Sequence, residues 1–202
     1  MESNSVSTRV GNPPVSAPGV SGKGTFYCQG NPAWSNTGCM GTAGCGVASM
    51  AMALSALGIP KTPLDVLAEY QSHPGWYSCG AGSTMTGAIL PSNWLRDLGV
   101  AVAPICSSCG KTLNTTIMKE YADKGYVFIA SSYKWPCVSC SGGGHPEINH
   151  IVMLEGADPT NNTVFVKDPN NCSYTTGAEF DTDRVRGASS IDWAYVYALK
   201  KI

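Results

Sequence analysis

Apolar residues recur at helical intervals in the first part of the chain. From Val47 to Leu57 they are spaced as on one face of a helix, and the opposite face carries alanine, methionine and serine but no charge. A helix without a charged face is expected to lie inside the protein. Apolar spacing, proline and glycine predict three more helices, at residues 63–71, 91–98 and 111–124.

Beyond Gly125 the pattern changes to short runs of β-branched and aromatic residues, which are typical of strands. These runs lie at residues 126–130, 150–154, 163–166 and 193–197. The segment Asp158-Pro-Thr-Asn-Asn162 has strong turn chemistry, so the second and third runs are expected to form an antiparallel hairpin. Helices followed by strands indicate an α+β fold, in which N-terminal helices pack on a C-terminal antiparallel β-sheet.

Cys45 lies between Gly44 and Gly46, where the buried helix is predicted to begin. Unpaired backbone N–H groups and the helix dipole favour an anion there, so the thiol pKa should fall and the cysteine become nucleophilic. The two glycines permit unusual backbone conformations and leave room for a substrate. A cysteine at such a place also fits a small buried core residue or one half of a disulfide.

The predicted hairpin offers a partner for this thiol. If the turn is centred near Pro159, His150 faces Asp168, close enough for the carboxylate to hold the imidazole. A slip of one residue would separate them, and the alternative is a histidine at the sheet edge with an aspartate that merely ends a strand. Together with Cys45, the two residues would supply a nucleophile, a base and a group that orients the base.

Length and charge limit the classes of function. A chain of 202 residues suits one domain, which is expected to span residues 25–202. Residues 1–24 are rich in Ser, Pro and Gly and are expected to form a flexible tail or linker, which hints at further domains. A net charge of −1 with 13% charged residues gives no sign of nucleic acid as a partner. No run of 18 apolar residues is present to span a membrane.

The nine cysteines indicate an oxidising compartment or a metal. With Cys45 free, the other eight can form four disulfides, which is our preferred interpretation, with no metal or cofactor expected. The pairs Cys106/Cys109 and Cys137/Cys140 are also able to bind zinc, although the 27 residues between them exceed the usual spacing. No signal peptide is visible, so an extracytoplasmic location requires a signal removed from this sequence, or release by cell lysis.

Two other histidines are weaker candidates for the base. His145 is able to serve as a zinc ligand or a rival base, but Gly142-Gly-Gly144 and Pro146 indicate a loop around it. His73 is followed by a proline and is interpreted as an ordinary loop residue.

Four segments in order carry a resemblance to a known family. They are Tyr27-Cys-Gln29 with Asn31-Pro-Ala-Trp34, Ala43-Gly-Cys45-Gly46 with residues 48–52, Asn149-His150 through Gly156, and Val166-Lys-Asp168-Pro169. The chain resembles the bacteriocin-leader (double-glycine) peptidase-like branch of the papain-like cysteine peptidases. The resemblance implies the papain-like fold, with Cys45 as nucleophile, His150 as base, Asp168 as orienter and Gln29 as the side-chain donor to the oxyanion. It departs at Val47, where members commonly carry proline.

These expectations describe a thiol hydrolase that cleaves a peptide or isopeptide bond. An extracytoplasmic or phage-type enzyme acting on the peptides of cell-wall peptidoglycan suits the cysteines and the linker. A processing peptidase for a secreted peptide is the other enzyme alternative. A catalytically silent module that binds a peptide or a wall polymer is the alternative outside the enzymes.

Overall fold

The computed structural model describes residues 24–80, 82–83, 93–135, 148–170 and 184–202. The helices are α1 (Met40–Ala43), α2 (Cys45–Ala56), α3 (Pro63–Ser72), α5 (Asn93–Asp97), α6 (Thr115–Ala122) and the short 3-10 helix η1 (Ala188–Ser190). The strands are β1 (Tyr77–Ser78), β2 (Gly82–Ser83), β3 (Val100–Gly110), β4 (Val127–Trp135), β5 (Ile148–Asp158), β6 (Thr163–Lys167), β7 (Arg184–Gly187) and β8 (Asp192–Lys201). The tail predicted at residues 1–24 lies outside the described residues except for Gly24. Within the described parts, no helix is long and apolar enough to cross a membrane.

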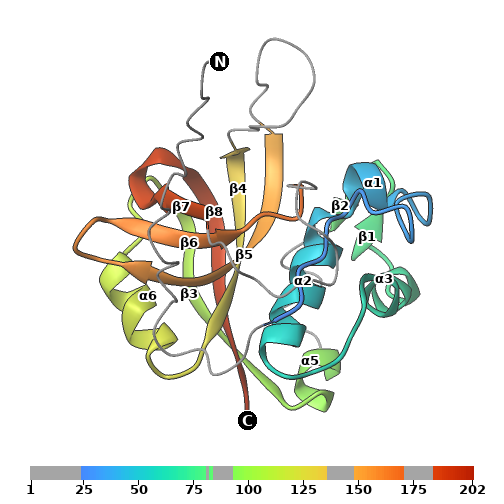
Figure 1. Cartoon of the computed structure of the whole chain (residues 1–202), viewed down its shortest axis with the longest axis horizontal. Coiled ribbons are helices and arrows are strands. Elements are labelled where there is room, and N and C mark those ends of the chain that lie inside the picture. Colours follow the sequence, from blue (N-terminus) through green and yellow to red (C-terminus); the bar gives the residue numbers. More distant parts are fainter. Residues whose placement is uncertain (1–23, 81, 84–92, 136–147, 171–183) are drawn as a thin grey trace, which may run out of the picture.

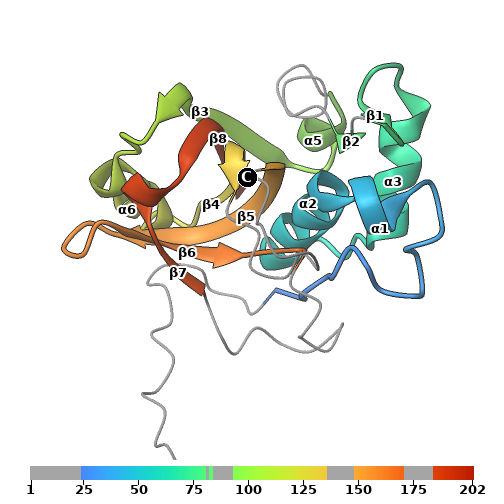
Figure 2. The same cartoon turned by 90° about the horizontal axis from the view of Figure 1, so that it is seen from above.

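The predicted α+β order is confirmed. Most of the helices come first, and the six strands β3-β8-β4-β5-β6-β7 form one antiparallel sheet in that spatial order (Figure 1). Helices α1, α2, α3 and α5 gather on one side of this sheet, whereas α6 lies away from them on the other (Figures 1 and 2). The side chains of the sheet therefore belong to two cores, one under α2 and one under α6.

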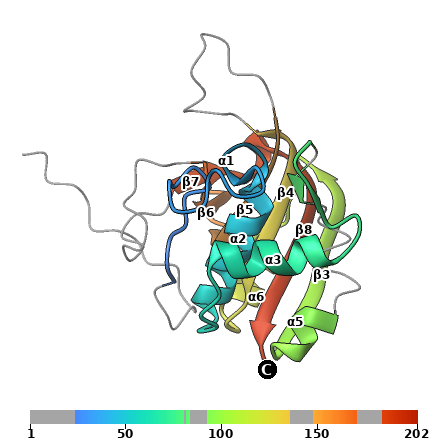
Figure 3. The same cartoon turned by 90° about the vertical axis from the view of Figure 1, so that its right-hand side faces the viewer.

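Helix α2 is buried as its uncharged surface predicts. It lies between the sheet and α3, which crosses its outer side (Figure 3). Ten of its twelve residues are buried, including Ser49. Helix α3 begins where predicted, because Thr62 and Asp65 form a capping box around Pro63 at the first helical position.

The helix predicted at residues 111–124 is shorter than expected. Asn114 caps it by accepting the N–H of Ile117 at 3.1 Å, so α6 begins at Thr115. Residues 111–114 form a short connection to β3, which ends at Gly110. The sequence pattern does not predict β3, which pairs with β8.

The β5–β6 hairpin forms, but the predicted pairing of His150 with Asp168 is wrong. Met153 pairs with Lys167, which shifts the register by two residues from the prediction, and a bulge lies between Leu154 and Gly156. At the Met153–Lys167 end of the hairpin, a shift of two leaves the side chains on their predicted faces, because faces alternate with a period of two. Between the bulge and the turn, the shift is three. His150 instead pairs with Ser132 of β4.

The described cysteines other than Cys45 are disulfide-bonded. Cys39 bonds to Cys79 and Cys106 bonds to Cys109, and Cys28 is also disulfide-bonded. The disulfide interpretation is thus confirmed for these cysteines. The first C-x-x-C pair forms a disulfide within itself, so its sulfurs are not free to bind zinc. Among the described residues, no group of three or more side chains is arranged to hold a metal ion. The second C-x-x-C pair and His145 lie outside the described residues.

Candidate active site

Cys45 is the first residue of α2 and is the free cysteine of the described chain. The residue as a whole is partly exposed, whereas those that follow it are buried. The residue before it, Gly44, offers no side chain to cap the helix, so the first-turn N–H groups remain for another acceptor. The backbone N–H of Gly46 is one donor to the sulfur.

Gly44 is required by a close approach rather than by unusual backbone angles. Its φ of −85° is open to any residue. A Cβ atom here would overlap the carbonyl oxygen of Met40 and lie 2.8 Å from its sulfur. The glycine therefore lets α1 pass directly into α2, so that α2 begins at Cys45.

His150 and Asp168 meet despite the shifted register. The imidazole Nε2 donates to Asp168 Oδ1 at 2.8 Å, and both side chains are buried, at 3% and 8% exposure. The same oxygen accepts the backbone N–H of Asn170 at 2.9 Å, and Oδ2 accepts the indole N–H of Trp135 at 3.2 Å. Three donors thus fix the carboxylate, and Nδ1 of His150 is left for the thiol of Cys45, to which the ring is hydrogen-bonded.

A stretch of β5 that pairs with β4 but not with β6 receives the start of α2. Strand β6 ends at Lys167, opposite Met153, so no β6 residue pairs with Ile151. The N–H of Ile151 donates to the sulfur of Cys45, and its carbonyl accepts the hydroxyl of Ser49 at 3.0 Å. Cys45 and Ser49 lie four residues apart on one face of α2, so two adjacent turns dock on a single strand residue.

These contacts govern the ionisation of the site. Burial opposes the thiolate of Cys45, but the hydrogen bond and the charge of His150, with the N–H groups of Ile151 and Gly46, outweigh it and lower the thiol pKa. Burial likewise opposes the imidazolium, yet Asp168 and Cys45 raise the pKa of His150 to about 10. The pKa of Asp168 is lowered, because its hydrogen bonds outweigh burial. The arrangement favours a thiolate beside an imidazolium.

Gln29 is buried and links the two ends of the site. Its backbone N–H donates to the carbonyl of Pro169 at 2.9 Å, directly after Asp168. Its side-chain Nε2 donates to the carbonyl of Gly41 at 3.1 Å, in the helix that precedes Cys45. An amide nitrogen carries two hydrogens, so a second donor remains.

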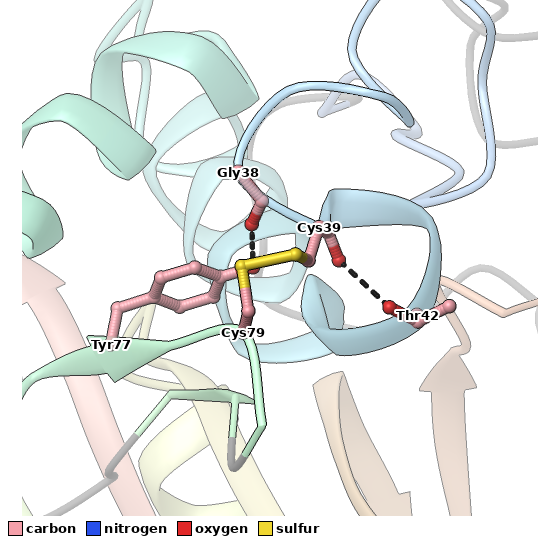
Figure 4. Close-up of a disulfide and its surroundings, with 5 residues drawn as sticks. All are labelled: Gly38, Cys39, Thr42, Tyr77 and Cys79. Carbon is pink, nitrogen blue, oxygen red and sulfur yellow. Dashed lines mark hydrogen bonds between the residues drawn. A yellow bond between two sulfur atoms is a disulfide. The ribbon is translucent and has the colours of Figure 1, made fainter.

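A disulfide holds an aromatic ring beside the site. Cys39 and Cys79 join the start of α1 to the residue after β1, and the hydroxyl of Tyr77 donates to the carbonyl of Gly38 at 2.6 Å (Figure 4). The pKa of Tyr77 is raised by burial and by the negative charge of Cys45. The ring therefore lies within electrostatic reach of the sulfur.

The structure brings together the predicted Cys45, His150 and Asp168, and it separates His73 from them. His73 stacks on Trp76 with ring centroids 4.0 Å apart, at the end of α3. Residues that the sequence reasoning missed are Ser49, Tyr77, Trp135 and Asn170. Of these, only Ser49 left a signal: a hydroxyl one turn after Cys45 in an otherwise apolar helix.

The chain is similar to known proteins over most of its length. The model of the Peptidase_C39 like family matches residues 26–197. Among solved structures, the chain is similar to one described as a C39-like peptidase from Bacillus anthracis, with 14% identity and a TM-score of 0.46, covering 80% of this chain and 90% of that one. No curated protein matches the chain. The family match covers most of the chain and shows that it belongs to the Peptidase_C39 like family and is a cysteine peptidase.

Proposed function

We propose that the protein hydrolyses a peptide or isopeptide bond through Cys45, His150 and Asp168. The observation that carries this is the continuous line of hydrogen bonds from the thiol of Cys45 through a buried imidazole to a buried carboxylate. It is the order of nucleophile, base and orienter that acyl transfer requires.

In the proposed reaction, the Cys45 thiolate attacks the carbonyl carbon of the scissile bond. The carbonyl π electrons move to oxygen and give a tetrahedral oxyanion. As this collapses, the C–N bond breaks and the imidazolium of His150 gives its proton to the leaving amine. His150 then takes a proton from water, whose oxygen attacks the thioester, and the second collapse releases the acid and restores the thiolate.

Gln29 is our proposed side-chain donor to the oxyanion. Its Nε2 keeps one hydrogen beyond the bond to Gly41, and its fixed position avoids reorganisation during the reaction. The backbone N–H of Cys45, at the start of α2, is the second proposed donor. One preorganised donor of this kind is worth about 3 kcal/mol in the transition state.

For the substrate we propose the peptides of cell-wall peptidoglycan, met outside the cytoplasm. The disulfides support an oxidising location, since such bonds persist there and are rare in the cytosol. Cys45 remains free beside them, as a thiol enzyme in such a compartment needs. Residues 1–24 suit a linker to a further domain.

Purified wall material tests the substrate proposal. Incubation with the protein should release peptide fragments with one new amine and one new carboxylate per cut, identified by mass spectrometry. Cys45→Ala and His150→Ala should each abolish this release while the circular-dichroism spectrum stays unchanged. Cleavage of a leader peptide after a glycine pair, with wall material untouched, would replace our substrate with the processing alternative.

Alkylation separates an enzyme from a silent binding module. Iodoacetamide at about neutral pH should modify Cys45 rapidly, because a thiolate beside an imidazolium reacts faster than an ordinary thiol. Slow labelling at the rate of an unfolded control would contradict the proposed triad, whatever the substrate.

A further inference from the structure

The indole of Trp135 lies behind the His150–Asp168 pair. Its Nε1 donates to Asp168 Oδ2 at 3.2 Å, on the carboxylate oxygen that His150 does not use. Its ring centroid is 5.5 Å from that of His150. At 1% exposure the ring is sealed from solvent, so water does not compete for this contact.

A break in the strand pairing brings the indole to this face. On a regular strand, Ser132 and Trp135 would point to opposite faces, since they are three residues apart. The pairing between β4 and β5 is irregular between these two residues and adds one residue to β4. The extra residue turns Trp135 to the face that Ser132 shares with His150, as bulges next to active sites do.

Ser132 stabilises this irregularity. Its hydroxyl donates to the carbonyl of Asp192 at 2.9 Å and accepts the N–H of Lys134 at 3.1 Å. Both are backbone groups where the regular ladder is interrupted. Beyond it, Trp135 packs edge-on against Trp193, with centroids 6.1 Å apart. The hydrogen bonds of Ser132 thus hold the irregularity that turns the indole to this face.

We propose that Trp135 is a positioning residue, which holds the Asp168 carboxylate so that it supports a charged His150. This inference rests on the proposed triad and adds to it a fourth residue from β4. The indole N–H donates to one carboxylate oxygen while the imidazole and Asn170 occupy the other. Rotation of the carboxylate would break all three bonds at once.

The groups around Asp168 determine in which direction the pH dependence of the thiolate shifts when the indole N–H is removed. Its bonded partner is His150, which in turn faces Cys45, and the adjacent Lys167 is paired with Glu155 at 3.5 Å. The donors to Asp168 stabilise its ionised form. Removing one raises the pKa of Asp168, so the carboxyl takes up a proton at higher pH. A neutral carboxyl holds the imidazolium weakly, and the thiolate then forms only at higher pH.

Trp135→Phe removes the N–H and keeps an aromatic ring. The rate of Cys45 alkylation by iodoacetamide, followed against pH, should show its acidic midpoint moved up by about 0.5–1 pH unit, as one charge-assisted hydrogen bond allows. With a substrate in hand, kcat should fall about tenfold with little change in KM, because the carboxylate does not contact the substrate.

Trp193→Phe is the matched control. Trp193 is equally buried, but its indole N–H donates to the carbonyl of Ala188 at 2.9 Å and not to the carboxylate. This variant should keep the wild-type midpoint. Equal shifts in both variants, or no shift in a folded Trp135→Phe protein, would overturn the role of Trp135. A wild-type thiol without an acidic thiolate form would instead overturn the triad itself.

A measurement on the wild-type protein covers the case in which Trp135→Phe does not fold. The five tryptophans give five indole N–H signals in a ¹⁵N spectrum, and that of Trp135 is recognised by its nuclear Overhauser contacts with the His150 ring. This signal should move as pH falls through the titration of Asp168, while that of Trp193 stays. A Trp135 signal that is constant across the titration would refute the inference.

Discussion

The bond from Ser49 to the carbonyl of Ile151 yields a sharp prediction. Ser49 is fully buried and the bond is 3.0 Å long. Ser49→Ala removes the donor, and β6 ends too early to offer the carbonyl another partner. Leaving a buried acceptor unpaired costs about 1–3 kcal/mol, so the free energy of unfolding should fall by that amount.

The same substitution should reduce the reactivity of the thiol. The N–H of Ile151 donates to the sulfur of Cys45, so one strand residue holds both turns of α2. Without the Ser49 bond, the start of the helix is held at one point and the sulfur loses its fixed distance to His150. A small misplacement of reacting groups is costly, and we expect about tenfold slower alkylation at neutral pH.

Ser55→Ala is the control, at the other end of the same helix. The hydroxyl of Ser55 accepts the N–H of Thr25 at 2.8 Å, far from the thiol. Urea unfolding should show a loss of stability in both variants, whereas alkylation should slow only in Ser49→Ala. If Ser49→Ala reacts like the wild type, or if Ser55→Ala slows as much, α2 is not docked through Ile151 in the way described.

Four further predictions concern the site and the disulfide beside it. The pKa of Cys45 is lowered from 9.0 and that of His150 is raised to about 10. The rate of hydrolysis should therefore rise as pH increases through the titration of the thiol, and it should fall only as pH passes the titration of His150. A rate maximum confined to acidic pH would contradict this. The charged His150 should also stabilise the fold below its unfolded pKa of 6.5, and this contribution should be lost as pH rises through about 10, as measured by urea unfolding against pH. Gly44→Ala should slow alkylation without loss of helix content, since the added methyl displaces the helix start; unchanged kinetics would show that the site absorbs the overlap. Replacing both Cys39 and Cys79 by serine should lower stability by about 4 kcal/mol on the chain-entropy account, read from thermal unfolding, and a change under about 1 kcal/mol would refute it.

Helix α2 could be predicted because three independent features of its sequence agree. The helical spacing, the absence of charge and the glycines around Cys45 all require a buried helix with an open start. Strand β3 was missed for the opposite reason. It contains Pro104 and small residues, and it lies at the sheet edge, where pairing with β8 rather than its own composition makes it a strand.

In the site, too, one contact could be predicted from the sequence and another could not. The contact between His150 and Asp168 was predicted, although the pairing that was expected to bring it about is not formed. Asp168 is the first residue after β6, and its side chain reaches the imidazole from there. Trp135 left no signal in the sequence. Its contact depends on an extra residue in β4, and a bulge is a property of the paired strands rather than of one of them.

The early end of β6 explains how the nucleophile and the base come together. If β6 continued two residues further, it would pair along Ile151 and occupy the N–H and the carbonyl that α2 uses. Because it stops at Lys167, the helix start docks against an open strand edge, and the chain is free to bend at Asp168. The backbone of Gln29 then binds Pro169 and keeps this bend in place. The thiol, the imidazole and the carboxylate are therefore assembled by one interrupted strand, and lengthening that strand should separate them.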